Sequence, residues 1–378
     1  MPINANAVLN RLQDQTIRDW SYLEASFTTH GEATRAANES DEAAAHPIMD
    51  KFITDLGSEE IRTLTNFTVT EFETLWSFVG TAMQSAWMEG RGRRSPTSPK
   101  DAMFMALTVL KHFSSWEKHA ADYGFKAPTF EKLIMRVLSV IEPIFYRRFI
   151  TTETMAELTQ TGQRFAHFPY ALYAVDVKFQ PSNRPADRFA EQKHYFSGKH
   201  HLYGYKIEAA VSPDGRCVAM STADPGSVHD LTIMNSRKHV HLANLAKSAS
   251  ESLVPDHGEQ AALHRGSDLE RNANVSSNRV IVENFFGRVC SLWRVSCATY
   301  TWSERNYSAI QRVTFALTNF DLSLLPLRHD DEDFYGRVLA RYQRMANEKK
   351  RKRQETQRRY RLNRQERAAM DAVRVMRF

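Results

Sequence analysis

The sequence predicts a mixed α/β protein in which a helical region precedes a β-rich region and a basic tail follows. Apolar residues recur at three- and four-residue steps between residues 66 and 150, which is typical of helices with one buried face. From residue 170 the apolar runs are short and rich in Tyr, Val and Phe, which is typical of strands. Lys and Arg dominate the last forty residues.

Length and composition narrow the class of protein. The chain has 378 residues, enough for about two domains, and 42% of them are hydrophobic, which excludes a disordered protein. No apolar run reaches the roughly 20 residues of a membrane helix, so no membrane partner is expected. The N-terminus lacks the basic and apolar segments of a signal peptide. Three cysteines without a CxxC pair predict reduced, buried thiols and argue against a zinc site.

The net charge of +6 conceals an asymmetry between the tail and the rest of the chain. Residues 337–378 contain 15 Lys or Arg and 4 Asp or Glu, a net charge of +11, so the remaining residues carry −5. With so few apolar residues, this tail is predicted to be a solvated helix or disordered. Five consecutive basic residues in it fit nuclear import or phosphate binding, and a merely solubilising tail is the alternative. They are Lys349, Lys350, Arg351, Lys352 and Arg353.

Residues 1–65 are small, polar and acidic, whereas residues 66–150 are predicted to end in a three-helix unit. In that unit Ser98 is a predicted N-cap, Pro99 the first helical residue, and Gly124 the stop of a short second helix. A helix, a turn with glycine and a second helix are typical of a helix-turn-helix that enters the major groove, although an ordinary helical domain has the same pattern. Phosphate contacts are predicted at Lys126, Lys132 and Arg136.

The β-rich region presents two acids in unexpected places. The strand YALYAVDVKFQ carries Asp176 in its middle, and an acid inside an apolar strand is out of place unless it has a function. Two further strands follow, joined by a Pro-Asp-Gly hairpin turn over 212–215. The stretch PGSVHDLTIM then begins a helix with Asp230 in its first turn.

A third acid, Glu283, lies in a helix predicted over 279–292. Because it follows Val280 by three residues, its carboxylate shares the apolar face of that helix. A carboxylate facing the core needs a partner, which is either Arg279 or Arg288, or a cation shared with other acids.

Taken together, Asp176, Asp230 and Glu283 predict a divalent-metal site. Nucleases that transfer phosphoryl groups hold two cations ~3.5–4 Å apart between such carboxylates, where one activates the attacking oxygen and the other stabilises the leaving oxygen. Mg²⁺ or Mn²⁺ is expected because both prefer oxygen ligands. We therefore expect the three carboxylates to converge on one pocket and the metal to stabilise the fold.

Several segments resemble the DDE domain of PIF/Harbinger-type transposases and their domesticated nuclease relatives. These segments are AVDVKFQ, YFSGKHHLYGYKIEAAV, PGSVHD and NRVIVENFFGR, followed by ALTNF. The resemblance covers residues 170–328 and implies a ribonuclease H-like fold in which Asp176 is the first catalytic acid and Glu283 the last. It also implies that Lys199 approaches DNA phosphate. The partners that it implies are double-stranded DNA and a separate Myb-like DNA-binding protein, and it allows a homo-oligomer.

One motif of that family is missing. Relatives carry a further strand ending in Asp-x-Gly-Tyr, whose aspartate binds metal, between PGSVHD and the final glutamate, but residues 250–277 contain neither the strand nor the motif. The ribonuclease H-like sheet would therefore lack its fourth strand, and Asp230 is the best remaining middle acid.

The sequence therefore predicts a nuclear, transposase-like DNA endonuclease that uses divalent metal ions for phosphodiester hydrolysis and strand transfer. The alternative is a catalytically inactive DNA-binding or partner-recruiting protein that keeps the fold.

Overall fold

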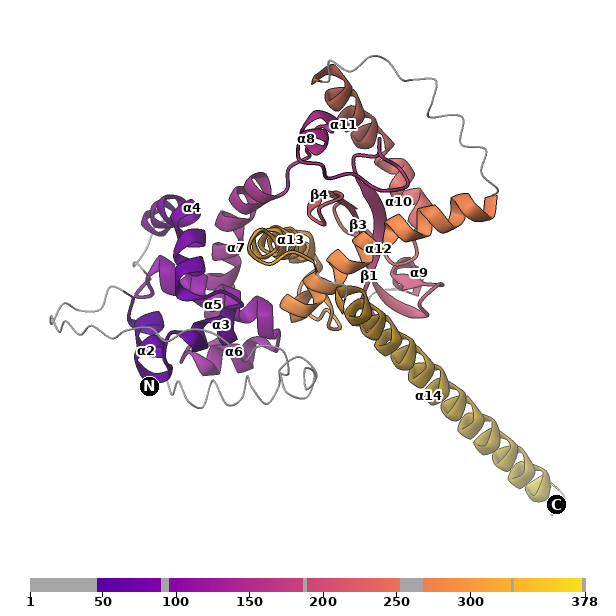
Figure 1. Cartoon of the computed structure of the whole chain (residues 1–378). Helices are drawn as coiled ribbons and strands as arrows, with labels where there is room; N and C mark the ends of the chain where they lie inside the picture. The colour runs from indigo at the N-terminus through magenta and orange to yellow at the C-terminus, as the bar shows by residue number, and fades with distance from the viewer. Residues whose placement is uncertain (1–45, 90–94, 186–188, 252–267, 328–329, 376–378) are drawn as a thin grey trace.

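The structure, a computed structural model, describes residues 46–89, 95–185, 189–251, 268–327 and 330–375. It consists of a helical bundle, a small sheet with helices around it, and a long C-terminal helix that projects from the body (Figure 1). One hydrophobic core runs from Met49 in the bundle to Ala346 in the last helix, so the helical region and the sheet region pack as one body. None of the described helices is long and apolar enough to cross a membrane.

The helical bundle confirms the local signals read from the sequence. Ser98 caps its helix by accepting a hydrogen bond from the Asp101 N–H, and Pro99 is the first helical residue. Thr68 and Glu71 form a capping box at the start of the preceding long helix. The bundle contains α2 (Pro47–Leu56), α3 (Glu59–Thr65), α4 (Val69–Met88), α5 (Pro99–His112), α6 (Trp116–Asp122), α7 (Ala127–Phe149) and α8 (Met155–Gln160).

The three predicted helices of the helix-turn-helix are α5, α6 and α7, with Gly124 at φ +73° in the turn between the last two. However, α7 is an internal helix, because it packs against α4, α5, α6 and α13 (Tyr307–Leu324). Arg136 on α7 donates hydrogen bonds to the carbonyls of Ala86 and Glu89 at the end of α4 and lies over the Trp87 ring. DNA recognition by α7 therefore stays a prediction, and Arg136 has a structural partner.

The sheet is built on a central strand, β3, which pairs antiparallel with each of the other strands. The predicted hairpin turn joins β3 to β4, and Gly215 in it takes a φ of +87°, which few residues other than glycine adopt. The strands are β1 (Ala174–Pro181), β2 (Phe196–Ser197), β3 (Leu202–Val211), β4 (Cys217–Met220) and β5 (Asp224–Pro225), and the short helix α9 (Phe189–His194) precedes β2.

The outer edge of β1 has no partner strand among the residues that the structure describes. At the C-terminal end of this edge, the Tyr300 N–H donates a hydrogen bond to the Pro181 carbonyl. Tyr300 also forms an isolated parallel β-bridge with Ser182. A fourth ribonuclease H-like strand would pair with this edge. Residues 252–267 of the interval that would carry such a strand lie outside the described residues, so its absence stays a prediction.

Helices after the sheet cover its two faces. α12 (Asp268–Leu292) contains the predicted helix with Glu283 and packs against β1 and β3, and α13 lies between the sheet and the bundle (Figure 1). α10 (Asp230–Ser236) and α11 (Lys238–Glu251) follow β5. The 3-10 helices η3 (Arg294–Ser296) and η4 (Glu304–Asn306) connect α12 to α13.

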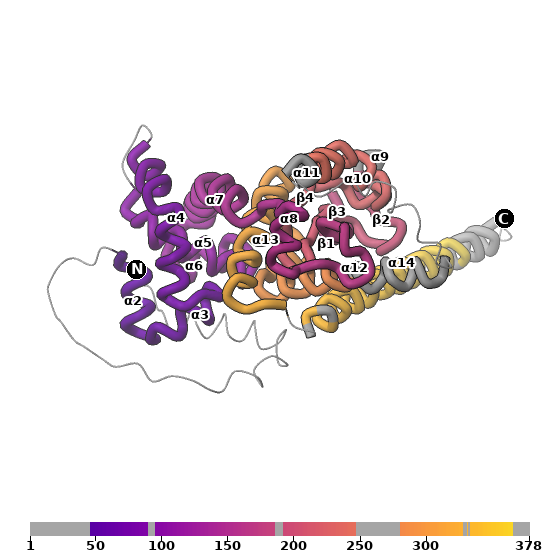
Figure 2. Tube along the Cα trace, turned by 45° about the horizontal axis from the view of Figure 1, so that its top comes forward, coloured from indigo at the N-terminus to yellow at the C-terminus, as the bar shows by residue number. Residues whose placement is uncertain are grey.

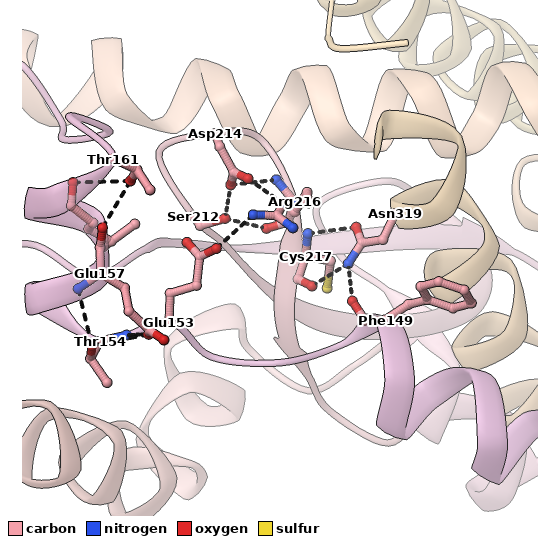
Figure 3. A network of polar contacts seen from close by, with 11 residues as sticks. Phe149, Glu153, Thr154, Glu157, Thr161, Ser212, Asp214, Arg216, Cys217 and Asn319 are labelled. Carbon is pink, nitrogen blue, oxygen red and sulfur yellow. Dashed lines mark hydrogen bonds and ion pairs between the residues drawn. The ribbon is translucent and has the colours of Figure 1, made fainter. Parts of the chain in front are cut away.

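An asparagine in the ALTNF stretch ties bundle, sheet and α13 together (Figure 3). The Asn319 amide donates to the carbonyls of Phe149 at the end of α7 (2.7 Å) and Cys217 in β4 (2.6 Å), and its oxygen accepts from the Cys217 N–H (2.9 Å). Beside it, Arg216 pairs with Glu153 and Asp214. This network satisfies backbone groups that helix and strand ends leave unpaired.

The basic tail forms the second half of one helix, α14 (Asp330–Val375), which extends away from the body (Figure 2). Its first half is part of the fold, because Tyr335, Val338, Tyr342 and Ala346 are buried in the core. From residue 347 to residue 365 the side chains are exposed. The charged arm therefore begins about ten residues later than the composition of the tail predicted.

Candidate functional site

Asp176 lies in the middle of β1, directly opposite Ala209 of β3. Side chains alternate along a strand, so Asp176 shares a face with Lys178 and Gln180, which bind the turn after α12. The buried Lys178 ammonium donates to the Ser296 carbonyl, and the buried Gln180 amide donates to the Val295 carbonyl (2.7 Å). These two polar residues, which the sequence reasoning passed over, hold β1 against the helical layer and so position Asp176.

The Asp176 carboxylate is turned along its own strand. Its Oδ1 accepts a hydrogen bond from the Val177 N–H at 2.8 Å. In the ladder with β3 the even-numbered residues of β1 exchange the backbone bonds, as the Ser182 N–H to Tyr203 carbonyl bond at its end shows. The Val177 N–H thus points to the outer edge, and the Asp176 side chain satisfies a donor that a neighbouring strand would normally bind.

Glu283 is half-buried on α12, the helix that crosses β1 and β3. The alternative that Arg288 is its ion partner is wrong: that guanidinium binds Asp321 (2.8 Å) and Asp331 (3.1 Å) together with the carbonyls of residues 325 and 326. The side chain of Arg279, the other expected partner, lies outside the described residues.

One buried phenol, that of Tyr335 on α14, lies within electrostatic range of all three candidate acids. Burial raises its pKa well above the usual value, and the charges of Cys290, Asp176, Glu283 and Asp230 raise it further. The charges of all three acids thus act on one buried group, which is a looser relation than a shared metal site requires.

Asp230, at the first turn of α10, is paired with two lysines. Its Oδ1 lies 2.8 Å from Lys206 Nζ and its Oδ2 lies 3.2 Å from Lys199 Nζ. Burial alone would raise the pKa of the Asp230 carboxyl, but the hydrogen bonds and charges of the two lysines outweigh it, and the net pKa is lowered. Lys206 is three residues before Ala209 on β3, so it points to the face opposite that of Asp176. Asp230 is therefore bound from the other side of the sheet.

The three carboxylates do not form one cluster. No three His, Cys, Asp or Glu side chains in the described parts of the chain lie close enough to share a metal ion. A divalent cation needs several oxygen ligands at 2.0–2.6 Å. The donors present do not fit one ion held by all three acids, because both oxygens of Asp230 are engaged by ammonium groups that neutralise its charge.

A buried acid of the sheet, Glu208, was missed by the sequence reasoning. It is fully buried on β3, where its Oε1 accepts from Arg237 Nε (2.6 Å) and contacts His241 Nε2 (3.2 Å). The other ring nitrogen of His241 contacts the Tyr173 hydroxyl at 3.0 Å. The network fastens α10 and α11 to the sheet. The sequence contained the same signal that singled out Asp176, because Glu208 is an acid inside the apolar strand YKIEAAV.

The predicted phosphate-binding residues divide between two ends of the molecule. Lys126 and Lys132 are exposed on the bundle, at the start of α7. Lys199 is exposed in the turn before β3, and the cluster 349–353 is exposed on α14. Within α14, Lys352 pairs with Glu348 (2.8 Å) and Arg351 lies 3.9 Å from Glu355, both at i, i+4 spacing.

An aromatic contact links the turn that carries Lys199 to α14. The Phe179 ring stacks on His200 with centroids 4.3 Å apart, and it meets the Tyr342 ring of α14 edge-on at 6.4 Å. Tyr342 precedes Lys349 by seven residues, about 10 Å along a helix. Burial lowers the pKa of His200 to about 4, with help from Lys199 and Lys206, so this ring is uncharged at neutral pH.

Comparison with known proteins shows a similarity of the sheet region to one family. Residues 175–319 match the family model described as DDE superfamily endonuclease, and the match runs from β1 to the Asn319 network in α13. It includes Asp176, Asp230 and Glu283 and supports a transposase-like nuclease domain of the DDE family, a superfamily that typically uses divalent metal ions. No curated protein and no solved structure matches the chain.

Proposed function

We propose that this chain is a duplex-DNA-binding protein derived from a PIF/Harbinger-type transposase, whose ribonuclease H-like domain lacks a working three-acid metal site. The observation that carries the proposal is the pairing of both Asp230 oxygens with Lys199 and Lys206 on the face of the sheet opposite Asp176. The middle ligand is then the one that disappeared with the missing strand, and the fold remains as a scaffold for DNA binding.

The DNA-binding surface in this proposal is the exposed arm of α14 together with the turn that carries Lys199. Nine Lys or Arg and two Asp or Glu occur between residues 348 and 364, and all of these side chains are exposed. A helix that is polar on all sides gains no stability from a buried face, so its charges are available to an anionic partner. Duplex DNA fits because it presents closely spaced phosphates along a groove that admits a helix.

Replacing residues 349–353 with alanine should weaken duplex binding and its dependence on salt. Each phosphate contact contributes about −0.9 to the slope of log K against log salt, so we expect the slope to become shallower by about 2–4. Fluorescence anisotropy over a range of salt concentrations measures both quantities. An unchanged slope would contradict the role of the arm.

A control with the opposite change of charge separates the electrostatic effect from an effect of alanine on the helix. Replacing Glu348 and Glu355 with alanine changes the same helix but removes acids, so binding should tighten. Alanine at Lys126 and Lys132 tests the helix-turn-helix prediction in the same assay. If those two substitutions alone flatten the slope, the bundle and not the arm contacts DNA.

A nuclear location is part of the proposal and rests on the same basic cluster. The five-alanine variant, fused to a fluorescent protein, should therefore remain outside the nucleus while the unmodified chain accumulates in it. The Myb-like partner protein and the homo-oligomer stay predictions from the resemblance alone.

An active metal-dependent endonuclease is the second candidate, favoured by the two acids on the α12 side of β1, Asp176 and Glu283. Nicking of supercoiled plasmid in Mg²⁺ or Mn²⁺ decides between the two. We expect the unmodified protein to nick plasmid no faster with either metal than the Asp176→Asn variant does. We also expect neither metal to raise its melting temperature. Nicking that Asp176→Asn and Glu283→Gln both abolish would establish the nuclease and overturn the scaffold proposal.

A further inference from the structure

The exposed arm of α14 has two different sides. One side is formed by residues that follow one another at steps of four and three, a spacing that aligns side chains along a helix. All of these residues are exposed, and Tyr360 among them is 69% exposed. They are Lys349, Arg353, Thr356, Tyr360 and Asn363, and they are called the front side of the arm below.

The front side continues the side of α14 that packs on the body. The buried residues Tyr342 and Ala346 extend the same spacing toward the start of the helix. The Tyr342 hydroxyl donates to the Cys297 carbonyl (2.7 Å), and its ring meets that of Phe179, which also stacks on the turn that carries Lys199. Because the helix is continuous, this packing fixes the direction of the front side, which is the side of the body and of that turn.

Both acids of the exposed arm lie away from the front side. At 3.6 residues per turn, Glu355 is about 140° around the helix axis from Tyr360, and Glu348 is about 120° from it. There Glu348 pairs with Lys352 (2.8 Å) and Glu355 with Arg351 (3.9 Å). Neither cation of the front side forms such a pair within the described parts of the chain. The front side therefore carries positive charge only, whereas acids reduce the positive charge of the opposite side.

The neutral side chains of the front side are suited to contacts with bases. Contacts with phosphate need only cations and carry no sequence information. Thr356, Tyr360 and Asn363 add hydroxyl and amide groups between the cations. In the major groove Asn binds adenine through two hydrogen bonds, Arg binds guanine in the same way, and Thr contacts the thymine methyl group. A coiled coil with a second copy of the chain does not fit, because its seam needs apolar residues at this spacing.

We propose that the front side of the arm lies in the major groove and binds base edges, so that α14 selects a DNA sequence. From Lys349 to Asn363 the arm extends about 21 Å, the length of about six base pairs, and the major groove is wide enough for a helix. Lys199 contacts a phosphate at the end of this segment nearest the body. The inference rests on the proposed function, because both place duplex DNA on the arm, and it adds which side of the helix binds and what that side recognises.

Arg353 and Arg351 provide a matched pair of substitutions, because two positions along a helix separate them by about 160° around its axis. The full-length protein first selects duplexes from a pool with a random core, and the enriched duplex is then compared with a scrambled duplex of the same composition. We expect Arg353→Ala to reduce the preference for the enriched duplex by about tenfold, as loss of one two-bonded base contact does. Arg351→Ala should weaken binding to both duplexes equally and leave the preference unchanged.

A modified duplex tests the groove without changing the protein. Replacing the purines of the enriched duplex with 7-deazapurines removes the N7 acceptors of the major groove and keeps base pairing and the minor groove. We expect the unmodified protein to bind this duplex more weakly than the enriched one. Equal binding to the two would overturn the major-groove contact.

Other outcomes separate this inference from the proposed function. A selection that enriches no sequence, or an equal loss of preference in Arg353→Ala and Arg351→Ala, would overturn sequence recognition by the front side. Either result would leave salt-dependent duplex binding by the arm in place. Absence of binding to every duplex would instead contradict the proposed function, and the inference with it. Both arginines are exposed and alanine favours a helix, so the two variants should keep the fold.

Discussion

Arg288→Met should lower the free energy of unfolding by roughly 3–5 kcal/mol, the range measured when one partner of a buried ion pair is removed. The Arg288 side chain is 8% exposed, and it binds two carboxylates, Asp321 and Asp331, that are 9% and 11% exposed. Burial raises the pKa of Asp321 even though Arg288 opposes the rise. Without the guanidinium, two carboxylates would be left close together in the core.

Urea unfolding followed by circular dichroism measures this loss, and Arg351→Met is its control. Arg351 lies in an exposed i, i+4 pair with Glu355, at 3.9 Å and with both side chains more than half exposed. Removing such a pair changes stability by at most about 0.5 kcal/mol. Equal effects of the two substitutions would show that the ion pairs of Arg288 with Asp321 and Asp331 add nothing to the packing of α14.

Gly287→Ala should destabilise the fold by about 1–3 kcal/mol, as overpacking of a dense core does. A Cβ at Gly287 would collide with the backbone oxygen of Asp331 in the first turn of α14. Backbone cannot rotate away as a flexible side chain can, so α14 would have to move off α12. The same shift would lengthen the hydrogen bonds from Arg288 to Asp331.

Gly336→Ala, on the exposed side of α14, should change stability in the opposite direction. Gly336 is exposed in α14, and a Cβ there meets no atom within 4 Å. Alanine in a helix is favoured over glycine by roughly 0.5–1 kcal/mol, so the melting temperature should rise. A loss of stability at Gly336, or none at Gly287, would contradict the described packing of α14 on α12.

Local features of the fold could be predicted because they depend on neighbours in the chain. Ser98 and Pro99 favour a helix start through their own side chains, and the Pro-Asp-Gly turn reverses a strand through the backbone freedom of Gly215. The absence of a fourth strand is a prediction of the same kind, since 250–277 has neither apolar alternation nor the expected motif. The family match over residues 175–319 agrees with the segments that suggested it.

By itself, then, the sequence determined the order of the main helices and strands, the similarity of the sheet region to the DDE family and the charge of the tail. Only the tertiary structure decided which charges meet. Arg288 and Glu283 are five residues apart on one helix, yet the guanidinium binds Asp331 instead. Asp230 has the right residue type and place in the motif, but it lies against Lys206, on the face of β3 opposite Asp176. Ion pairs form between groups that tertiary packing brings together. Periodicity along a strand tells which residues share a face of the sheet, but it does not tell which helix covers that face.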